Sequence, residues 1–234
     1  MFPVGVANEL DIYIAIKDAI IQQKLRPSMQ LVEEVIAESF GVSRTPVRNV
    51  LRKLAGEKLV TVIPYKGTFV ACPTVDEAKE VFEMRRVIEA SSVKKVSGKL
   101  TADQLGQLSR LLDEEHQAHH NGDPLLALRL SGNFHLKIAE FTGNNYYYRY
   151  LEELISLTYV IIALYGMSKH MHCSDHRRLV LLIEQGDAEQ AERLMIEHLK
   201  EIEDTLQFEE KGTAPQSLSE VFRLANGHYA SAKS

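Results

Sequence analysis

Three histidines stand at positions where helical periodicity predicts apolar core residues. His135, His176 and His198 each fall among aliphatic residues at helical spacing, in three separate stretches of the chain. Such apolar stripes face the interior of a helical bundle. A buried polar group is costly unless it is hydrogen-bonded or coordinates a metal, and imidazole is the usual ligand of zinc- and nickel-like ions. The three residues together predict a divalent-metal site, whereas each one alone is better explained by a hydrogen bond to a backbone carbonyl.

Arg85 interrupts an apolar stripe in the same way, because Val81 and Ile88 lie at helical spacing from it. An unpaired guanidinium inside a bundle is costly, and an anionic ligand would offset that cost. The hypothesis is that a small carboxylate binds the metal and uses Arg85 as a second anchor. His172, four residues before His176, is a weaker candidate for a substitute metal ligand.

A second group of cations lies nearer the start of the chain. Arg44, Arg48 and Arg52 recur every four residues, which places them on one face of a helix whose core side carries Leu51 and Leu54. Guanidinium groups on the opening turns of such a helix suit phosphates and guanine edges in the major groove of DNA. This spacing predicts a DNA-reading helix.

The elements that position these arginines form a predicted helix-turn-helix. A short amphipathic helix over residues 31–38 precedes a turn at Gly41. Ser43 is placed to cap the second helix, and Pro46 falls in its first turn, where a missing N–H costs little. An earlier helix over residues 7–24 packs under these two.

A predicted hairpin follows the arginine-bearing helix. Two β-rich runs, 59–63 and 68–71, flank a Pro-Tyr-Lys-Gly turn. Lys66 and Gly67 at its tip suit a wing that approaches the minor groove or phosphates. An ordinary surface hairpin is the alternative, and the position directly after a helix-turn-helix favours the wing.

The rest of the chain is helical by pattern. The predicted helices cover residues 75–97, 101–120, 123–142, 144–170, 172–185 and 187–210. Their short connections indicate an antiparallel bundle. The predicted fold is therefore mainly α: an N-terminal winged helix-turn-helix domain over 1–73, an all-α helical-bundle effector domain over 74–212, and a tail over 213–234. A brief amphipathic segment at 218–224 lies in that tail, whose end is expected to be disordered.

Composition is that of a globular protein, with 45% hydrophobic and 25% charged residues among 234. Two cysteines, Cys72 and Cys173, give no disulfide framework and are interpreted as free thiols in a reducing cytoplasm. No run is as long as a membrane span, and the start lacks the layout of a signal peptide. A cytoplasmic protein without membrane attachment is expected.

Charge is distributed unevenly along the chain. The net charge is −5, yet residues 1–72 carry nine Lys and Arg against seven Asp and Glu, and all nine histidines lie at or beyond His116. This asymmetry is what a DNA reader joined to a ligand sensor would need.

The motifs of the first half resemble a known family. The run Ser-Arg-Thr-Pro-Val-Arg at 43–48, followed by Leu51, Leu54 and Leu59–Val60, resembles the winged helix of the GntR family of bacterial transcription regulators. The remaining chain resembles that family's all-helical FadR-type (FCD) effector domain. The two resemblances together cover residues from about 7 to 210.

The helical half carries four segments of this resemblance: Phe134-His135 followed by Thr142–Asn144, Asp175–Arg177, Glu197–Leu199, and Glu83–Glu89. Metal-binding members of the family use three such histidines and an aspartate one helical turn before the first. That position is Ser131 here. A serine hydroxyl is a poor zinc ligand, so the fourth position would fall to water or to the effector's own carboxylate. The predicted effector contacts are Arg85, Ser131 and Asn144.

The resemblance also extends to DNA contacts and assembly. Taken with the spacing of the cations, it predicts DNA contacts at Arg44, Thr45, Arg48, Arg52, Lys66 and Gly67. Glu34 occupies a place where some relatives carry a base-contacting arginine, which puts one contact in doubt. The resemblance implies a homodimer formed through the helical domain, and paired reading heads favour a near-palindromic operator. The tyrosines at 146, 147, 148 and 150 are expected in core and dimer packing.

The predicted function is a ligand-responsive bacterial transcription regulator, a repressor that senses a small carboxylate metabolite and is not an enzyme. One alternative is a metalloenzyme that acts on a small acid through three histidines, which leaves residues 7–72 unexplained. The other is a regulator of the same family without a metal, in which the histidines hydrogen-bond an organic ligand directly.

Overall fold

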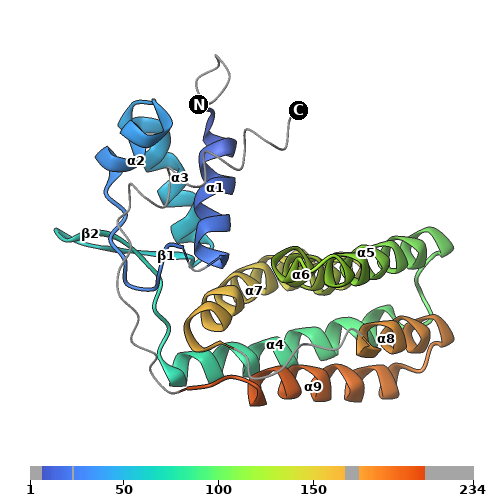
Figure 1. Cartoon of the computed structure of the whole chain (residues 1–234). Helices are drawn as coiled ribbons and strands as arrows, with labels where there is room; N and C mark the ends of the chain where they lie inside the picture. The colour runs from blue at the N-terminus through green and yellow to red at the C-terminus, as the bar shows by residue number, and fades with distance from the viewer. Residues whose placement is uncertain (1–6, 23, 167–173, 209–234) are drawn as a thin grey trace. The chain divides into compact units, whose positions relative to one another are not determined.

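The computed structural model of the protein describes residues 7–22, 24–166 and 174–208 (Figure 1). The chain forms two compact units. The first contains the residues up to Thr74 together with Tyr159–Gly166, and the second contains Val75–Thr158 and the chain up to Gln207. None of the helices in these ranges is long and apolar enough to cross a membrane.

The first unit is a three-helix cluster with a hairpin. Its elements are α1 (Glu9–Ile21), α2 (Glu33–Phe40), α3 (Arg44–Gly56), β1 (Val60–Ile63) and β2 (Gly67–Val70). Asn8 starts α1 with a capping box, since its side chain accepts from the Asp11 N–H while the Asp11 carboxylate accepts from the Asn8 N–H. Gly41 ends α2 with a left-handed φ of 66°, which turns the chain into α3.

The core of this unit follows the predicted stripes. Its fully buried side chains include Ile12, Ile16, Ile20, Leu25, Leu31, Ile36, Leu54 and Leu59. The strands pair antiparallel, with Val60 opposite Val70 and Ile63 opposite Gly67. The chain before α2 joins β2 as well, because Leu31 N–H donates to Thr68 O at 2.7 Å. The hairpin is thus tied to the helices from which it projects.

Among the described residues, the second unit contains α4 (Val75–Val96), α5 (Ala102–His120), α6 (Pro124–Phe141), α8 (Ser174–Gln185) and α9 (Ala188–Asp204). It also contains α7 (Asn145–Tyr165) as far as Thr158, while the end of α7 from Tyr159 belongs to the first unit. Helix α4 packs against α9 and α6, α5 packs against α6 and α8, and α8 packs against α9. Side-chain caps at Thr101, Asp123 and Asp187 begin α5, α6 and α9, as their positions before each apolar run lead one to expect. The antiparallel run of α4 and α9 is visible in Figure 1.

Two glycines that end helices also meet each other. Gly98 follows α4 with φ 70°, and Gly186 follows α8 with φ 76°. A Cβ on Gly98 would lie 3.2 Å from the Gly186 Cα, and the Gly98 N–H donates to Ile183 O at 2.8 Å. Both the backbone conformation and this close approach require glycine, so the stop signals also dock α4 against α8.

The ends of two helices differ most from the prediction. Helix α7 ends at Tyr165, not at residue 170, because Gly166 follows in the left-handed region with φ 67°. Helix α9 ends at Asp204, not at residue 210, where the Thr205 hydroxyl and N–H both donate to Ile202 O and close the last turn. The predicted start of α8 at residue 172 and the segment 218–224 lie outside the described residues.

Candidate functional site

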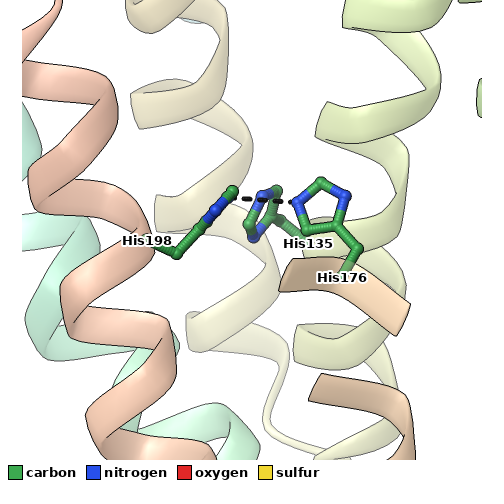
Figure 2. Close-up of side chains that lie close together, drawn as sticks. All are labelled: His135, His176 and His198. Atoms are coloured by element: carbon green, nitrogen blue, oxygen red, sulfur yellow. Dashed lines mark hydrogen bonds between the residues drawn. The ribbon is translucent and has the colours of Figure 1, made fainter. Parts of the chain in front are cut away.

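The three predicted histidines come together inside the second unit. His135 lies on α6, His176 on α8 and His198 on α9, and all three side chains are buried. One nitrogen from each ring lies within 4.8 Å of the other two. His176 Nε2 and His198 Nε2 are 3.1 Å apart, and the rings point toward one another in Figure 2. Three helices distant in sequence therefore present one cluster of imidazole nitrogens.

Each of these imidazoles has a carboxylate at its Nδ1 atom. The Nδ1–oxygen distances are 2.5 Å from His135 to Glu89, 3.1 Å from His176 to Glu115, and 3.6 Å from His198 to Asp175. The contact of His135 with Glu89 joins two side chains that are almost fully buried. Carboxylates in this position orient metal-binding histidines and fix which nitrogen is left to bind.

The electrostatics favour the neutral form of His135 and His198. Burial lowers the pKa of His135 to about 4, against the opposing effect of Glu89. Burial also lowers the pKa of His198, although Asp175 opposes the shift. Burial alone would raise the pKa of Glu89, but Arg85 and His135 together outweigh it and bring that pKa to about 2. The cluster therefore combines the uncharged imidazoles of His135 and His198 with the ionised carboxylate of Glu89.

These residues fit a divalent metal. His135 Nε2 is buried and has no hydrogen-bond partner in the described part of the chain, which is costly for a polar atom. Neutral imidazole is the form that binds metal, and the surrounding carboxylates supply negative charge. Ser131, one turn before His135 on α6, is buried as well. Its hydroxyl stands at the position where an aspartate would add a fourth, negatively charged ligand to the three histidines.

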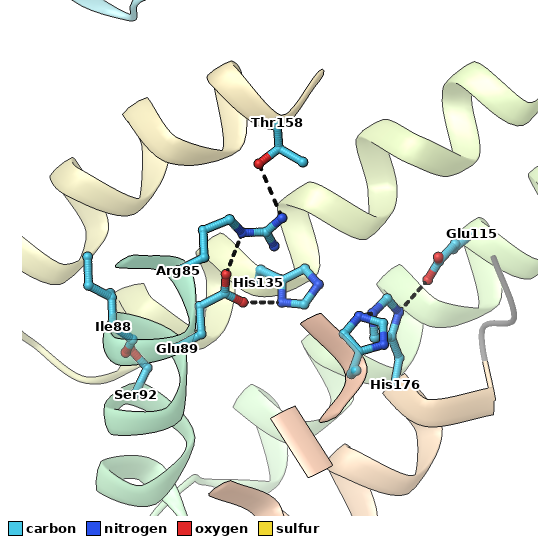
Figure 3. Close-up of polar contacts among 9 residues, drawn as sticks. Arg85, Ile88, Glu89, Ser92, Glu115, His135, Thr158 and His176 are labelled. Carbon is cyan, nitrogen blue, oxygen red and sulfur yellow. Dashed lines mark hydrogen bonds and ion pairs between the residues drawn. The ribbon is translucent and has the colours of Figure 1, made fainter. Parts of the chain in front are cut away.

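Arg85 is paired within the protein, so the expectation of an unpaired guanidinium was wrong. Its Nε donates to Glu89 Oε1 at 2.7 Å and its Nη1 donates to Thr158 Oγ1 at 3.3 Å, as Figure 3 shows. Both members of the ion pair are almost fully buried, with 4% and 1% of their side chains exposed. Glu89, one turn along α4, already neutralises the guanidinium and joins it to His135.

Asn144 lies at the start of α7, where its side chain accepts from the Tyr146 N–H at 3.0 Å. Its own N–H donates to the Thr142 hydroxyl at 3.1 Å. These contacts explain the residue as a helix cap. A role for Asn144 in effector binding stays a prediction. Tyr146 and Tyr150, expected in core and dimer packing, are exposed in the single chain and stack on each other with ring centroids 6.2 Å apart. Their part in dimer packing stays a prediction.

Glu115, Asp175 and Thr158 were not identified from the sequence as parts of this site. A signal for Glu115 was present, because it follows Leu108 and Leu112 on the buried face of α5. A carboxylate on such a stripe requires a partner, just as the histidines do. His172 and Cys173 lie outside the described residues.

The predicted DNA-contacting residues are exposed on the first unit. On α3, Arg44, Thr45, Arg48 and Arg52 face solvent while Val47, Val50, Leu51 and Leu54 are buried, so the helix has the expected two faces. Ser43 occupies the N-cap position with an extended backbone, but its side chain makes no capping hydrogen bond. The Ser43 hydroxyl therefore lies beside the N-terminus of α3, where the first N–H groups of the helix have no partner within the helix.

Two of these arginines pair with the first turn of α2. Arg44 Nη2 donates to Glu34 Oε1. Arg48 donates from Nε and Nη2 to the two oxygens of Glu33, at 3.1 and 2.8 Å. That hydrogen bond lowers the pKa of Glu33 below its usual range, against its partial burial. Arg52 has no carboxylate within ion-pair distance among residues 7–22, 24–166 and 174–208.

The wing tip is formed by Tyr65, Lys66 and Gly67. Lys66 N–H donates to Ile63 O at 3.1 Å, which closes a tight turn. Gly67 has φ 115°, and a Cβ there would lie 3.0 Å from the Gln30 amide nitrogen. Glycine is therefore required by the hairpin itself. Tyr65 has φ 62° and a fully exposed side chain, at 109% of its reference area.

A winged helix with exposed arginines, followed by a helical unit with buried ligand-type side chains, defines a DNA-binding transcription regulator with an effector domain. Two family models match the chain: the gntR family of bacterial regulatory proteins over residues 8–70, and the FCD domain over residues 80–201. The chain belongs to the GntR family, in the FadR-type group that carries an FCD domain. The predicted family and mainly helical fold class are confirmed.

Relatives agree with this assignment. The chain is 26% identical to the HTH-type transcriptional regulator YdhC of Bacillus subtilis over 81% of its own length and 86% of the relative's. It is 24% identical to the transcriptional repressor RspR of Escherichia coli, over 83% and 87% of the two chains. A GntR regulator from Rhodococcus shares the fold, with a TM-score of 0.73, 22% identity and coverage of 84% of this chain and 95% of that one.

Proposed function

We propose that this regulator binds a near-palindromic operator as a homodimer in the cytoplasm and represses transcription until a small carboxylate binds its helical unit. The proposed DNA contacts are Arg44, Thr45, Arg48, Arg52, Lys66 and Gly67. The guanidinium groups of α3 suit guanine edges and phosphates, and the wing cation suits the phosphate backbone. Effector binding would shift the population of dimers that can engage DNA.

The proposed sensor is a divalent ion of the zinc or nickel type held by His135, His176 and His198. Such an ion would supply a positive charge that the oxygens of a carboxylate ligand can coordinate. Ser131 offers no negative charge to that centre, so the ligand's carboxylate is the anion best suited to complete it. Arg85 is a second proposed anchor, reached through the guanidinium donors that Glu89 and Thr158 do not occupy.

The observation that carries the sensor proposal is the arrangement of carboxylates around the imidazoles. Glu89, Glu115 and Asp175 all approach Nδ1 atoms. The Nε2 atoms of His176 and His198 lie within hydrogen-bond distance of each other, and His135 Nε2 has no hydrogen-bond partner among the residues that the structure describes. Carboxylates on the Nδ1 side orient ligands and do not face the nitrogens that converge. This favours a regulatory metal centre over a metalloenzyme with a general base.

The test is metal content and Zn²⁺ binding. Protein purified without chelators is analysed by mass spectrometry for bound metal, then stripped and titrated with Zn²⁺ against a chromophoric chelator. We expect about one ion per chain in the wild type and in His116→Ala, which removes an exposed histidine of α5. His176→Ala should lose it. Absence of metal on purification together with absence of Zn²⁺ binding would overturn the metal proposal.

A metal-free regulator of the same family is the second candidate. It is favoured by the 3.1 Å contact between His176 Nε2 and His198 Nε2, which satisfies both atoms if one ring donates to the other. A thermal-shift screen of acetate, malate and succinate on stripped protein separates the two candidates. Stabilisation that requires added Zn²⁺ supports the metal centre, whereas equal stabilisation without Zn²⁺ supports the metal-free form.

A further inference from the structure

The first turn of α2 places two carboxylates beside the arginines proposed to read DNA. Glu34 pairs with Arg44, and Glu33 pairs with Arg48. The Arg44–Glu34 pair is open to solvent, with 56% and 59% of the two side chains exposed. The opening turns of α2 and α3 therefore carry as many negative as positive charges at this surface, where a non-selective DNA binder would carry cations alone.

The two pairs differ in how many guanidinium donors they occupy. Glu33 takes both Nε and Nη2 of Arg48, whereas Glu34 takes only Nη2 of Arg44. A guanidinium has five N–H donors, so Arg44 can direct the remaining ones to a guanine edge while Glu34 holds it in place. A phosphate that approached Arg44 in place of a base would also approach the Glu34 carboxylate and be repelled.

We propose that Glu34 is a specificity-determining residue: it suppresses phosphate contacts of Arg44 with non-operator DNA and leaves base contacts with the operator available. This inference rests on the proposed DNA-binding function. Binding to arbitrary duplex is supplied almost wholly by cation–phosphate contacts, so a carboxylate beside a reading arginine acts mainly on that component. The protein would then discriminate operator from non-operator DNA, because base contacts depend on hydrogen-bond geometry more than on net charge.

The test uses Glu34→Gln, which removes the charge and keeps the shape and a hydrogen-bond acceptor. The probes are a duplex selected from a random library by the wild-type protein and a scrambled duplex of equal length and composition. Affinities are measured by fluorescence anisotropy from 50 to 200 mM salt. For the scrambled duplex we expect affinity to rise about threefold and the salt slope to steepen by about 0.9, the effect of one added phosphate contact. The selected duplex should change less.

Glu38→Gln is the matched control, since Glu38 is an exposed carboxylate of the same helix with no ion pair to residues that the structure describes. It should leave both salt slopes near the wild-type values. Equal changes for the two duplexes in Glu34→Gln, or no change in either, would overturn the inference while leaving DNA binding intact. Failure of the wild type to select any duplex would instead overturn the proposed function.

Tyr65 supports a second, independent inference about the same unit. A left-handed backbone is unfavourable for a bulky residue, and a fully exposed aromatic ring gains nothing from packing. A strained, exposed tyrosine at a wing tip is explained by a contact made outside the chain. The geometry points to Tyr65 as a DNA contact of the wing, with its ring against the sugar backbone and its hydroxyl at a phosphate.

The test is Tyr65→Asn, because asparagine tolerates the left-handed region. We expect weaker binding to the selected duplex with Tm unchanged or raised, a combination that a structural role would not produce. Val62→Thr, at an exposed position of β1, is the control for loss of apolar surface on the hairpin. Unchanged affinity in Tyr65→Asn, or a fall in Tm that accompanies the loss of affinity, would overturn this inference.

Discussion

Two Arg–Glu pairs in this molecule have the same chemistry and opposite surroundings. Arg44–Glu34 lies in solvent on the surface proposed to read DNA, whereas Arg85–Glu89 lies inside the helical unit, beside His135. A solvent-exposed pair is worth little and exchanges partners easily. A buried pair holds its geometry because separating it leaves a charge without solvent. The first pair is suited to yield to a ligand and the second to hold a site in place.

The largest expected difference between the pairs is their effect on stability. Glu89→Gln leaves the Arg85 guanidinium buried without its counter-charge, so the free energy of unfolding should fall by about 3–5 kcal/mol. Glu34→Gln should leave it unchanged within error. Urea denaturation followed by circular dichroism measures both. The double variant Arg85→Met/Glu89→Leu should recover most of the loss. If the single variants Glu89→Gln and Glu34→Gln are equally stable, burial does not make the Arg85–Glu89 pair more important for stability than the exposed one.

The second prediction concerns pH and metal-stripped protein. His135 has a folded pKa of about 4 against an ordinary 6.5, so its contribution to stability is complete above pH 6.5 and is lost as pH falls toward 4. Glu89 has a folded pKa of about 2 against 4.5, so its contribution is lost below pH 4.5.

Urea midpoints at pH 7.5, 6, 5 and 4 test this, with the loss beginning near pH 6.5. His116→Gln, at an exposed histidine of α5, should keep the whole profile. The exposed ion pairs of the first unit should contribute little to this profile, because solvent screens them. A flat profile between pH 7.5 and 4 would contradict the burial argument for His135.

The third prediction sharpens the role of the carboxylates around the histidines. Glu115→Gln keeps the shape of the side chain but weakens its hold on His176 Nδ1, and Zn²⁺ affinity should fall about 10–100-fold. Glu114→Gln, at the exposed neighbouring position, should bind Zn²⁺ as the wild type does. Competition with a chromophoric chelator gives both constants, and equal affinities in the two variants would exclude an orienting role for Glu115.

The smallest expected effect is a change in DNA affinity without a change in fold. Arg52→Ala removes a cation of α3 that has no carboxylate partner in the described residues, so its loss acts on phosphate contacts directly. Affinity for selected and scrambled duplexes should fall by the same factor, about threefold. Arg48→Ala should weaken the selected duplex more. A loss confined to the selected duplex in Arg52→Ala would assign that residue to base contacts.

Much of the fold was predictable because its signals are local. The spacing of Ile12, Ile16 and Ile20, the glycine at 41, and the β-rich runs and turn residues of the hairpin depend only on neighbouring residues. The histidines were found for a related reason, since a polar residue on an apolar stripe is visible within one helix. The ends of α7 and α9 were placed too late, because apolar periodicity continues past the residues where capping contacts stop the helix.

What the sequence by itself determined is which side chains face inward and which face outward: His135, His176 and His198 toward a core, Arg44, Arg48 and Arg52 toward solvent. Only the tertiary structure decided their partners. Glu115 reaches His176 from 61 positions away, and Glu34 reaches Arg44 across the turn between α2 and α3. Periodicity sets the direction of a side chain on its own helix, but the charges that it meets depend on how separate helices pack.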